Sequence, residues 1–357
     1  MRASCSAYRC GLRPKLDECD AARQQTQMTA LDPNSVVIGL NACVMAMRFD
    51  APHVLTVPPA PVLEGRAEAL PFGPFDPQHH RTLDLGLRSL VEAQTHVMLG
   101  YVEQLYTFGD RGRHALQPSE GPRVVSVGYL ALTRTSDVDT GSTAAHWRSC
   151  YDFFPWEDFR QGRPEIIDAL IRPALSAWCE AGEGLADLRQ DRLSMCFAAD
   201  GAQWDDEKVL ERYELLYEAG LVLEARVDGR DLPPTAPKAE VQAMLGQAMR
   251  FDHRRILATA IGRLRGKLKY RPVVFELMPE TFTLLDLQRT VEAITGAPLH
   301  KQNFRRLVET SGLVEPAGQR TARAGGRPAQ EFRFRKDVLR ERPAPGVKVG
   351  GVRNVKR

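Results

Sequence analysis

One stretch near the C-terminal end restricts the fold of this chain most strongly, the segment Arg271–Val308 with the sequence RPVVFELMPETFTLLDLQRTVEAITGAPLHKQNFRRLV. Its pattern predicts a strand, then a helix that begins after Thr283, a side chain suited to the N-cap position. Gly296 and Pro298 end that helix. A second, short helix follows, so the segment has the order of elements of a helix-turn-helix.

The second helix is expected to present a free polar face. Phe304, Leu307 and Val308 share one side and anchor it, while the polar residues fall elsewhere around the cylinder. Recognition helices read base edges with such side chains, Arg with guanine and Gln or Asn with adenine. The predicted reading set is Lys301, Gln302, Asn303, Arg305 and Arg306, where Asn303 can instead cap or position the helix.

Positive charge is concentrated behind this motif. Residues 299–357 hold 15 Lys and Arg against 5 Asp and Glu, a net charge of +10, whereas the whole chain carries +3. Two strands are predicted at 313–316 and 331–335, and with the helices they make a winged helix over 273–340, followed by a flexible basic tail, 341–357. The expected partner is double-stranded DNA, although winged helices also dock proteins. The residues expected to reach phosphates or the minor groove from the hairpin are Arg320, Arg323 and Arg327.

The first half of the chain has the character of an α+β domain. Residues 1–33 lack periodicity and are predicted to be a disordered extension, so translation from either Met1 or Met28 stays open. Residues 34–160 form the expected domain, with 70–80 as a Gly/Pro loop. The predicted elements are strands at 36–47, 54–57, 101–108 and 124–133 and a helix at 81–96.

Helical patterns dominate the middle of the chain. Residues 161–250 are interpreted as a helical insert, in which a stripe from Ile166 to Ile171 is broken by Pro173. Residues 251–272 predict a basic amphipathic helix, interpreted as a solvated linker.

Composition excludes several classes of protein. No run approaches the roughly 18 consecutive apolar residues of a membrane span, and the first residues lack a signal-peptide core. The seven cysteines occur singly, without CxxC pairs, so neither a disulfide framework nor a zinc site is indicated. We expect a cytoplasmic, nucleoid-associated protein that needs no metal or other cofactor.

The phrases LPFGPF, EQLYTFGDRGR and RVVSVGYLALT resemble a Nudix domain, and FELMPETFTLLDLQ and KQNFRRL resemble the winged-helix half of the Nudix-related transcriptional regulators of NAD metabolism, the NrtR-like family. The resemblance covers residues 36–160 and 251–337. It implies a Nudix-like mixed sheet domain, a helical insert and a C-terminal winged helix-turn-helix.

The catalytic box of Nudix hydrolases, REUxEExGU with U aliphatic, is degenerate here. Its clustered carboxylates hold the magnesium ions that activate water. Aligned with the box, residues 89–97 read SLVEAQTHV, and only Asp84 and Glu92 are acidic on this helix. Eight residues apart, they are separated by about 80° and more than two turns, too far to hold one ion cluster. His79 and His80 are interpreted as surface residues rather than substitute ligands. We therefore expect no catalytic residues and no hydrolysis.

The resemblance implies that the domain still senses ADP-ribose or a related NAD metabolite. The candidate ligand-binding residues are Glu103, Phe108, Arg111, Arg113 and Arg123, the cations for phosphates and Phe108 for stacking on a base. The implied protein is a homodimeric regulator, expected to repress NAD metabolism genes from a palindromic operator. Two alternatives stay open, an ADP-ribose pyrophosphatase with a basic appendage and an interaction scaffold.

Overall fold

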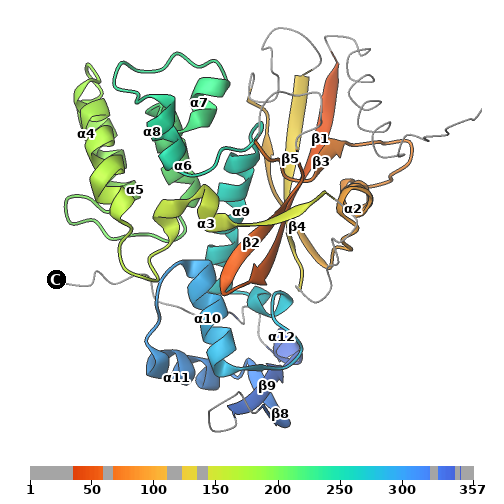
Figure 1. Ribbon diagram of the computed structural model, residues 1–357. Coiled ribbons are helices and arrows are strands. Elements are labelled where there is room, and N and C mark those ends of the chain that lie inside the picture. Colours follow the sequence, from red (N-terminus) through yellow and green to blue (C-terminus); the bar gives the residue numbers. More distant parts are fainter. Residues whose placement is uncertain are drawn as a thin grey trace, which may run out of the picture.

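The protein combines a mixed sheet, a helical segment and a C-terminal winged helix; in Figure 1 the helical segment lies beside the sheet and the winged helix lies below both. The predicted N-terminal extension and almost all of the predicted tail lie outside the part that the computed structural model describes. The described residues are 35–58, 67–110, 123–134, 144–321, 329–341 and 346, without the side chains of 319–321, 339 and 341.

Six strands form the mixed sheet, in the order β4-β5-β1-β2-β6 with β3 also paired to β1. The β1–β5 pair is parallel and the other pairs are antiparallel. Four of the strands confirm the sequence-based expectation; β3 and β6 were missed. The bounds are β1 (Val36–Arg48), β2 (Ala51–Thr56), β3 (Phe72–Pro74), β4 (Tyr101–Phe108), β5 (Arg123–Leu132) and β6 (His146–Ser149).

Strand β3 lies in the segment predicted as a Gly/Pro loop, so that prediction was wrong in part. β1 is long enough to pair with β2 along its second half and with β3 along its first half. A side chain at Gly73 would place its Cβ 2.6 Å from Leu90 Cδ1, so the glycine lets β3 approach the helix that follows.

Helices cover both faces of the sheet. On one face α2 (Leu83–Thr95) packs Leu87 and Val91 against alternate residues of β1, such as Leu40 and Val44. Its N-cap is Thr82, whose hydroxyl accepts a hydrogen bond from the Leu85 amide. The helix predicted over 81–96 is confirmed.

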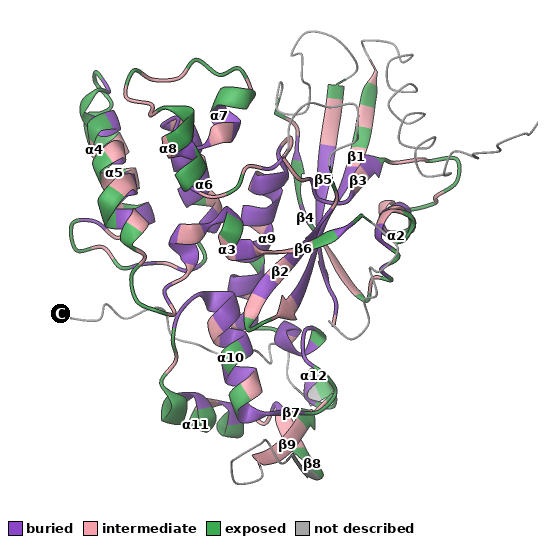
Figure 2. Ribbon diagram, in the orientation of Figure 1, coloured by how far each residue is buried: buried purple, intermediate pink, exposed green. Residues whose placement is uncertain are grey.

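The other face is covered by α9 (His253–Leu268), and here the expectation of a solvated linker was wrong. Most of this helix is buried, and Figure 2 shows it largely in purple between the sheet and the helical segment. Arg254 and Arg265 are both at most 1% exposed. The basic composition suggested exposure to solvent, but these guanidinium groups bind buried carboxylates and carbonyls instead of water.

The helical segment predicted over 161–250 is confirmed in character. The expected break at Pro173 was wrong, because the π-helical turn η3 runs directly into α4 and Pro173 lies in the first turn, where its missing N–H matters little. Two short elements precede the segment, α3 (Cys150–Phe153) and η2 (Pro155–Glu157). The segment itself contains η3 (Ile167–Ile171), α4 (Arg172–Glu180), α5 (Ala186–Phe197), α6 (Val209–Glu218), α7 (Leu223–Val227) and α8 (Ala239–Met244).

The C-terminal part is a winged helix, which confirms the prediction. Its first element is the 3-10 turn η4 and not the predicted strand. The three apolar residues of η4 are buried, and one of them, Phe275, stacks on Phe334 with 4.4 Å between the ring centroids. The sheet position is instead filled by β7. The bounds are η4 (Val273–Glu276), β7 (Phe282–Thr283), α10 (Leu284–Thr295), α11 (Lys301–Ser311), β8 (Val314–Thr321), β9 (Ala329–Phe334) and α12 (Val338–Glu341).

One hydrophobic core runs through all three parts. It begins at Cys43 in the sheet, continues through Trp156 and Leu216, and reaches Phe304 and Val338 in the winged helix. The winged helix is therefore packed onto the rest of the protein and not merely tethered to it.

Candidate functional site

The helix α11 exposes the residues predicted to read DNA. Phe304 and Val308 are at most 3% exposed and fix one side of the helix to the core. Figure 2 shows α11 mostly green at the edge of the molecule. No ion pair with a described residue occupies the cations of this set. The exposed residues are Lys301, Gln302, Asn303, Arg305 and Arg306.

The turn between α10 and α11 is fixed by side chains of α10. Thr283 and Asp286 form a reciprocal capping box at the start of α10, and Gly296 ends it with a left-handed φ of 72°. After the turn, the Leu299 amide donates to Glu292 Oε1 at 2.8 Å, and Gln288 donates to the Leu299 carbonyl at 3.1 Å. The recognition helix therefore has a set direction relative to α10.

The wing is an antiparallel hairpin of β8 and β9. Arg333 pairs with Glu315 across the hairpin at 2.7 Å, and Arg335 donates to the Gly312 carbonyl at 3.0 Å. Of the predicted wing cations, Arg320 has a described backbone in β8, while Arg323 and Arg327 lie outside the described residues.

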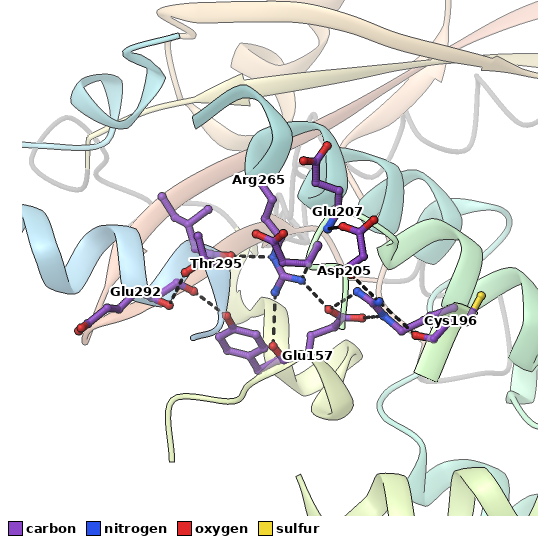
Figure 3. A network of polar contacts seen from close by, with 12 residues as sticks. Glu157, Cys196, Asp205, Glu207, Arg265, Glu292 and Thr295 are labelled. Carbon is purple, nitrogen blue, oxygen red and sulfur yellow. Dashed lines mark hydrogen bonds and ion pairs between the residues drawn. The ribbon is translucent and has the colours of Figure 1, made fainter. Parts of the chain in front are cut away.

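The C-terminal end of α10 is held by a buried polar network, drawn in Figure 3. Arg265 of α9 donates from Nε to the Ile294 carbonyl at 2.8 Å and pairs with Glu157 at 2.5 Å. The Tyr151 hydroxyl donates to the Ala293 carbonyl at 2.6 Å. These contacts place positive charge at the negative end of the α10 dipole.

Glu157 is the centre of this network. Arg212 of α6 binds it through two nitrogens, at 2.5 and 2.9 Å, and Arg265 binds it from α9. Burial raises the pKa of the Glu157 carboxyl, but the charges and hydrogen bonds of Arg212 and Arg265 outweigh burial and hold that pKa below its usual value. The helical segment thus supports the winged helix through Glu157 and Arg265.

Sequence reasoning missed this network, although a signal was present. Arg254 and Arg265 are eleven residues apart, about three turns, so they fall on the same side of α9 as Ile261 and Leu268. An arginine on an apolar face indicates a buried partner.

The predicted effector residues do not converge on one point. Glu103 lies opposite Leu130 on β5, whereas Arg123 begins β5 seven residues earlier, about 23 Å along a strand. Phe108 and Arg123 lie at the same end of the β4–β5 pair, where Arg123 Nη2 donates to the Gly109 carbonyl at 3.0 Å. Arg111 and Arg113 lie outside the described residues.

Glu103 and Phe108 are both engaged with α9. Lys267 binds Glu103, and the Tyr101 hydroxyl donates to the same carboxylate at 2.7 Å. Burial raises the pKa of Glu103, but these contacts hold it below its usual value. Phe108 is 2% exposed, with the Arg255 guanidinium 5.3 Å from its ring centroid. In this conformation Phe108 presents no free face for a base.

Positions that the sequence analysis aligned with the Nudix box have structural roles. Leu90 packs against Gly73, and Gln94 exchanges two hydrogen bonds with the backbone of Phe72, at 2.8 and 3.2 Å. Both stand where the hydrolase box has acids. Asp84 pairs with Arg88 at 2.8 Å on the exposed side of α2.

Carboxylates that could share a metal ion were found, among the described residues, only at Asp205, Asp206 and Glu207. Lys269 pairs with Asp206 at 3.2 Å and with Glu207 at 2.5 Å, so an ammonium group already contacts two of these three carboxylates. His79, weighed above as a ligand, contacts Asp76 at 2.6 Å in an exposed turn. Within the described residues, no helix is long and apolar enough to cross a membrane.

Together, these features define a class of protein: a helix-covered mixed sheet that carries a winged helix with an exposed recognition helix. Residues 274–334 match the family profile described as the NrtR DNA-binding winged helix domain. The resemblance drawn from the sequence is thus confirmed for the winged helix, which the α+β fold joins to a helix-covered mixed sheet.

Similar proteins agree with this assignment. The ADPR responsive transcriptional repressor NtrR of Acinetobacter baylyi is 45% identical over 84 residues, which are 24% of this chain and 33% of that protein. The match thus spans about a third of the relative's length. Two crystal structures of NrtR from Shewanella oneidensis share the fold, each with a TM-score of 0.50. The structure in complex with a 27mer DNA is 18% identical and covers 85% of this chain and 95% of that chain. The structure without DNA is 19% identical and covers 84% of this chain and 95% of that chain.

Proposed function

We propose that this protein is a DNA-binding transcriptional repressor of NAD metabolism genes, regulated by ADP-ribose or a related nucleotide. The observation that carries the proposal is α11, whose Lys, Gln, Asn and Arg side chains are exposed on a helix fixed from behind. Such a surface fits the edges of bases in a major groove. The name of the Acinetobacter relative, an ADPR responsive repressor, supports both the regulatory role and the effector.

The effector contacts are proposed at the loop end of β4 and β5. Arg111, Arg113 and Arg123 supply cations for a diphosphate. Phe108 lies at the same end beneath Arg255, while Glu103 lies farther along β4 and is held by Lys267, so neither is assigned a contact with the diphosphate. Calorimetry with ADP-ribose, NAD and nicotinamide mononucleotide tests this binding, and no heat from any of them would remove the effector from the proposal.

We also propose that the Nudix-like domain does not hydrolyse its ligand. The support is that Leu90 and Gln94 hold β3 at positions where a hydrolase needs carboxylates. Purified protein with ADP-ribose and magnesium should release no AMP. Magnesium-dependent cleavage would instead favour the pyrophosphatase alternative.

Recognition of a palindromic operator requires two winged helices, so the proposed active form is a homodimer. Sedimentation of the protein with and without operator DNA tests this, with two chains per duplex expected.

A gel-shift assay tests the function as a whole. The probes are the DNA upstream of the protein's own gene and of NAD synthesis genes, with a shuffled duplex as control. We expect retention of specific duplexes at concentrations that leave the shuffled duplex free, and a change in retention when ADP-ribose is added. Equal retention of all duplexes contradicts the proposal.

A further inference from the structure

The helix α9 contacts the effector end of the sheet through Arg255. Its guanidinium lies 5.3 Å from the Phe108 ring centroid, donates to Asp110 Oδ2 at 2.5 Å and pairs with Glu214 of α6 at 2.7 Å. Asp110 follows Gly109, whose carbonyl accepts a hydrogen bond at 3.0 Å from Arg123, one of the proposed phosphate-binding residues. Arg255 is therefore the point at which α9 meets the proposed effector region.

Further along the helix, a second set of contacts holds α9 to β4. Lys267 binds the Glu103 carboxylate and donates to the Tyr101 hydroxyl at 2.8 Å, and Arg263 pairs with Glu103 at 3.4 Å. The Lys267 and Glu103 side chains are 15% and 18% exposed. These contacts clamp the C-terminal half of α9 to the sheet.

The two ion pairs differ in how easily a ligand can replace a partner. The Asp110 side chain is 56% exposed, whereas that of Arg255 is 17% exposed. An anion arriving from solvent can displace a carboxylate that is half in water, and a phosphate offers the guanidinium a comparable charge-assisted contact. The pair of Asp110 with Arg255 is thus exchangeable, while the Glu103 clamp is shielded.

On its other side, α9 holds the DNA-binding part. At about 100° per residue, Arg265 points about 160° to 200° away from Arg263 and Lys267. Arg265 binds the Ile294 carbonyl at the end of α10, and the side chains of α10 fix the start of α11. A shift of α9 at the sheet therefore reaches the recognition helix through packed side chains.

We propose that Arg255 is the positioning residue that couples the effector to DNA binding, because an anionic effector replaces Asp110 at its guanidinium and moves α9. This inference rests on the proposed function and specifies its regulation. Arg255 contacts no DNA; it acts through α9, α10 and α11.

The test compares the ratio of DNA dissociation constants with and without saturating ADP-ribose in four proteins, by fluorescence anisotropy on the full chain. For the wild type we expect a ratio of about 5- to 150-fold, the usual range of such coupling. Arg255→Met should bring the ratio to within about twofold of one. Arg263→Met, which removes the same charge from α9 away from the loop, should keep the wild-type ratio.

Asp110→Asn is the second variant, chosen because a half-exposed side chain can be changed without unfolding the protein. It weakens the hold on Arg255, so its DNA affinity without effector should move toward that of the effector-bound wild type. A wild-type ratio in Arg255→Met, or an unchanged affinity in Asp110→Asn, overturns the inference but leaves the proposed function standing. A wild type with a ratio of one overturns the proposed function and this inference with it.

Discussion

Arg265 of α9 binds α10, the first α-helix of the winged helix. Its Nε donates to the Ile294 carbonyl at the C-terminal end of α10, at 2.8 Å. The same guanidinium pairs with Glu157 at 2.5 Å, and both side chains are at most 1% exposed. The orientation of the winged helix is thus set by a buried charge on the helix that covers the sheet.

Removal of Arg265 should destabilise the whole protein. Arg265→Met leaves the Glu157 carboxylate with one buried partner instead of two and uncaps α10, so we expect a loss of about 3–5 kcal/mol in the free energy of unfolding. Urea denaturation followed by circular dichroism measures it. Arg263→Met is the matched control, since its side chain is 43% exposed and its loss should cost less than about 1 kcal/mol. Equal losses in the two variants would mean that the buried network of Arg265 stabilises the fold no more than an exposed ion pair does.

The contribution of Glu157 should depend on pH. Its pKa in the folded protein is held below the value of about 4.3 expected for the unfolded chain, so the carboxylate stabilises the fold above that value. The stabilisation is lost as the pH falls through the folded-state pKa. The difference in unfolding free energy between wild type and Glu157→Gln should therefore be largest near pH 7 and shrink below about pH 4. A difference that stays constant over this range would contradict the assigned charge.

Gly296 should tolerate no side chain. Its φ is 72°, and an added Cβ would lie 2.2 Å from the Glu157 carbonyl oxygen. Gly318, with a φ of 79° and no atom within 4 Å of an added Cβ, separates strain from collision. Gly318→Ala should cost about 1–2 kcal/mol from the left-handed backbone alone, and Gly296→Ala clearly more. Thermal unfolding measures the loss of stability in both variants. Equal losses would show that close packing around Gly296 adds nothing to the cost of the left-handed backbone.

Two arginines of the DNA-binding part should behave differently on DNA. Arg305→Ala should cost about 1–3 kcal/mol on the operator and little on random duplexes, because a base contact carries sequence information. Arg323→Ala should weaken binding to all sequences alike and flatten the salt dependence. Glu309→Ala, on the exposed side of α11, is the control and should not weaken binding. Equal losses on specific and random duplexes for both arginine variants would show that α11 is not the reader.

The elements that the sequence predicted well are those with a strong local pattern. The capping residues Thr283 and Gly296 and the short runs of strand-forming residues in β4 and β5 depend on neighbours in the chain, so local sequence patterns located them. The exposed set on α11 followed from the same reasoning, because Phe304 and Val308 mark its inner face.

What the sequence did not predict depends on partners far away in the chain. Arg265 was read as solvated because its partner Glu157 lies 108 residues earlier, and no local pattern connects them. The same holds for Glu103, predicted as a ligand contact but clamped by Lys267, and for β3, whose pairing with β1 is tertiary. The candidate effector residues were chosen by resemblance, and the strand register separates Glu103 from Arg123.

The most direct test of the account is an anisotropy titration of the full-length protein on a labelled upstream duplex and on a shuffled duplex of equal length, each with and without ADP-ribose. The account predicts specific binding at least about a thousandfold tighter than binding to the shuffled duplex, and a change in the specific affinity alone on addition of ADP-ribose. Equal affinity for both duplexes, unaffected by ADP-ribose, would contradict it.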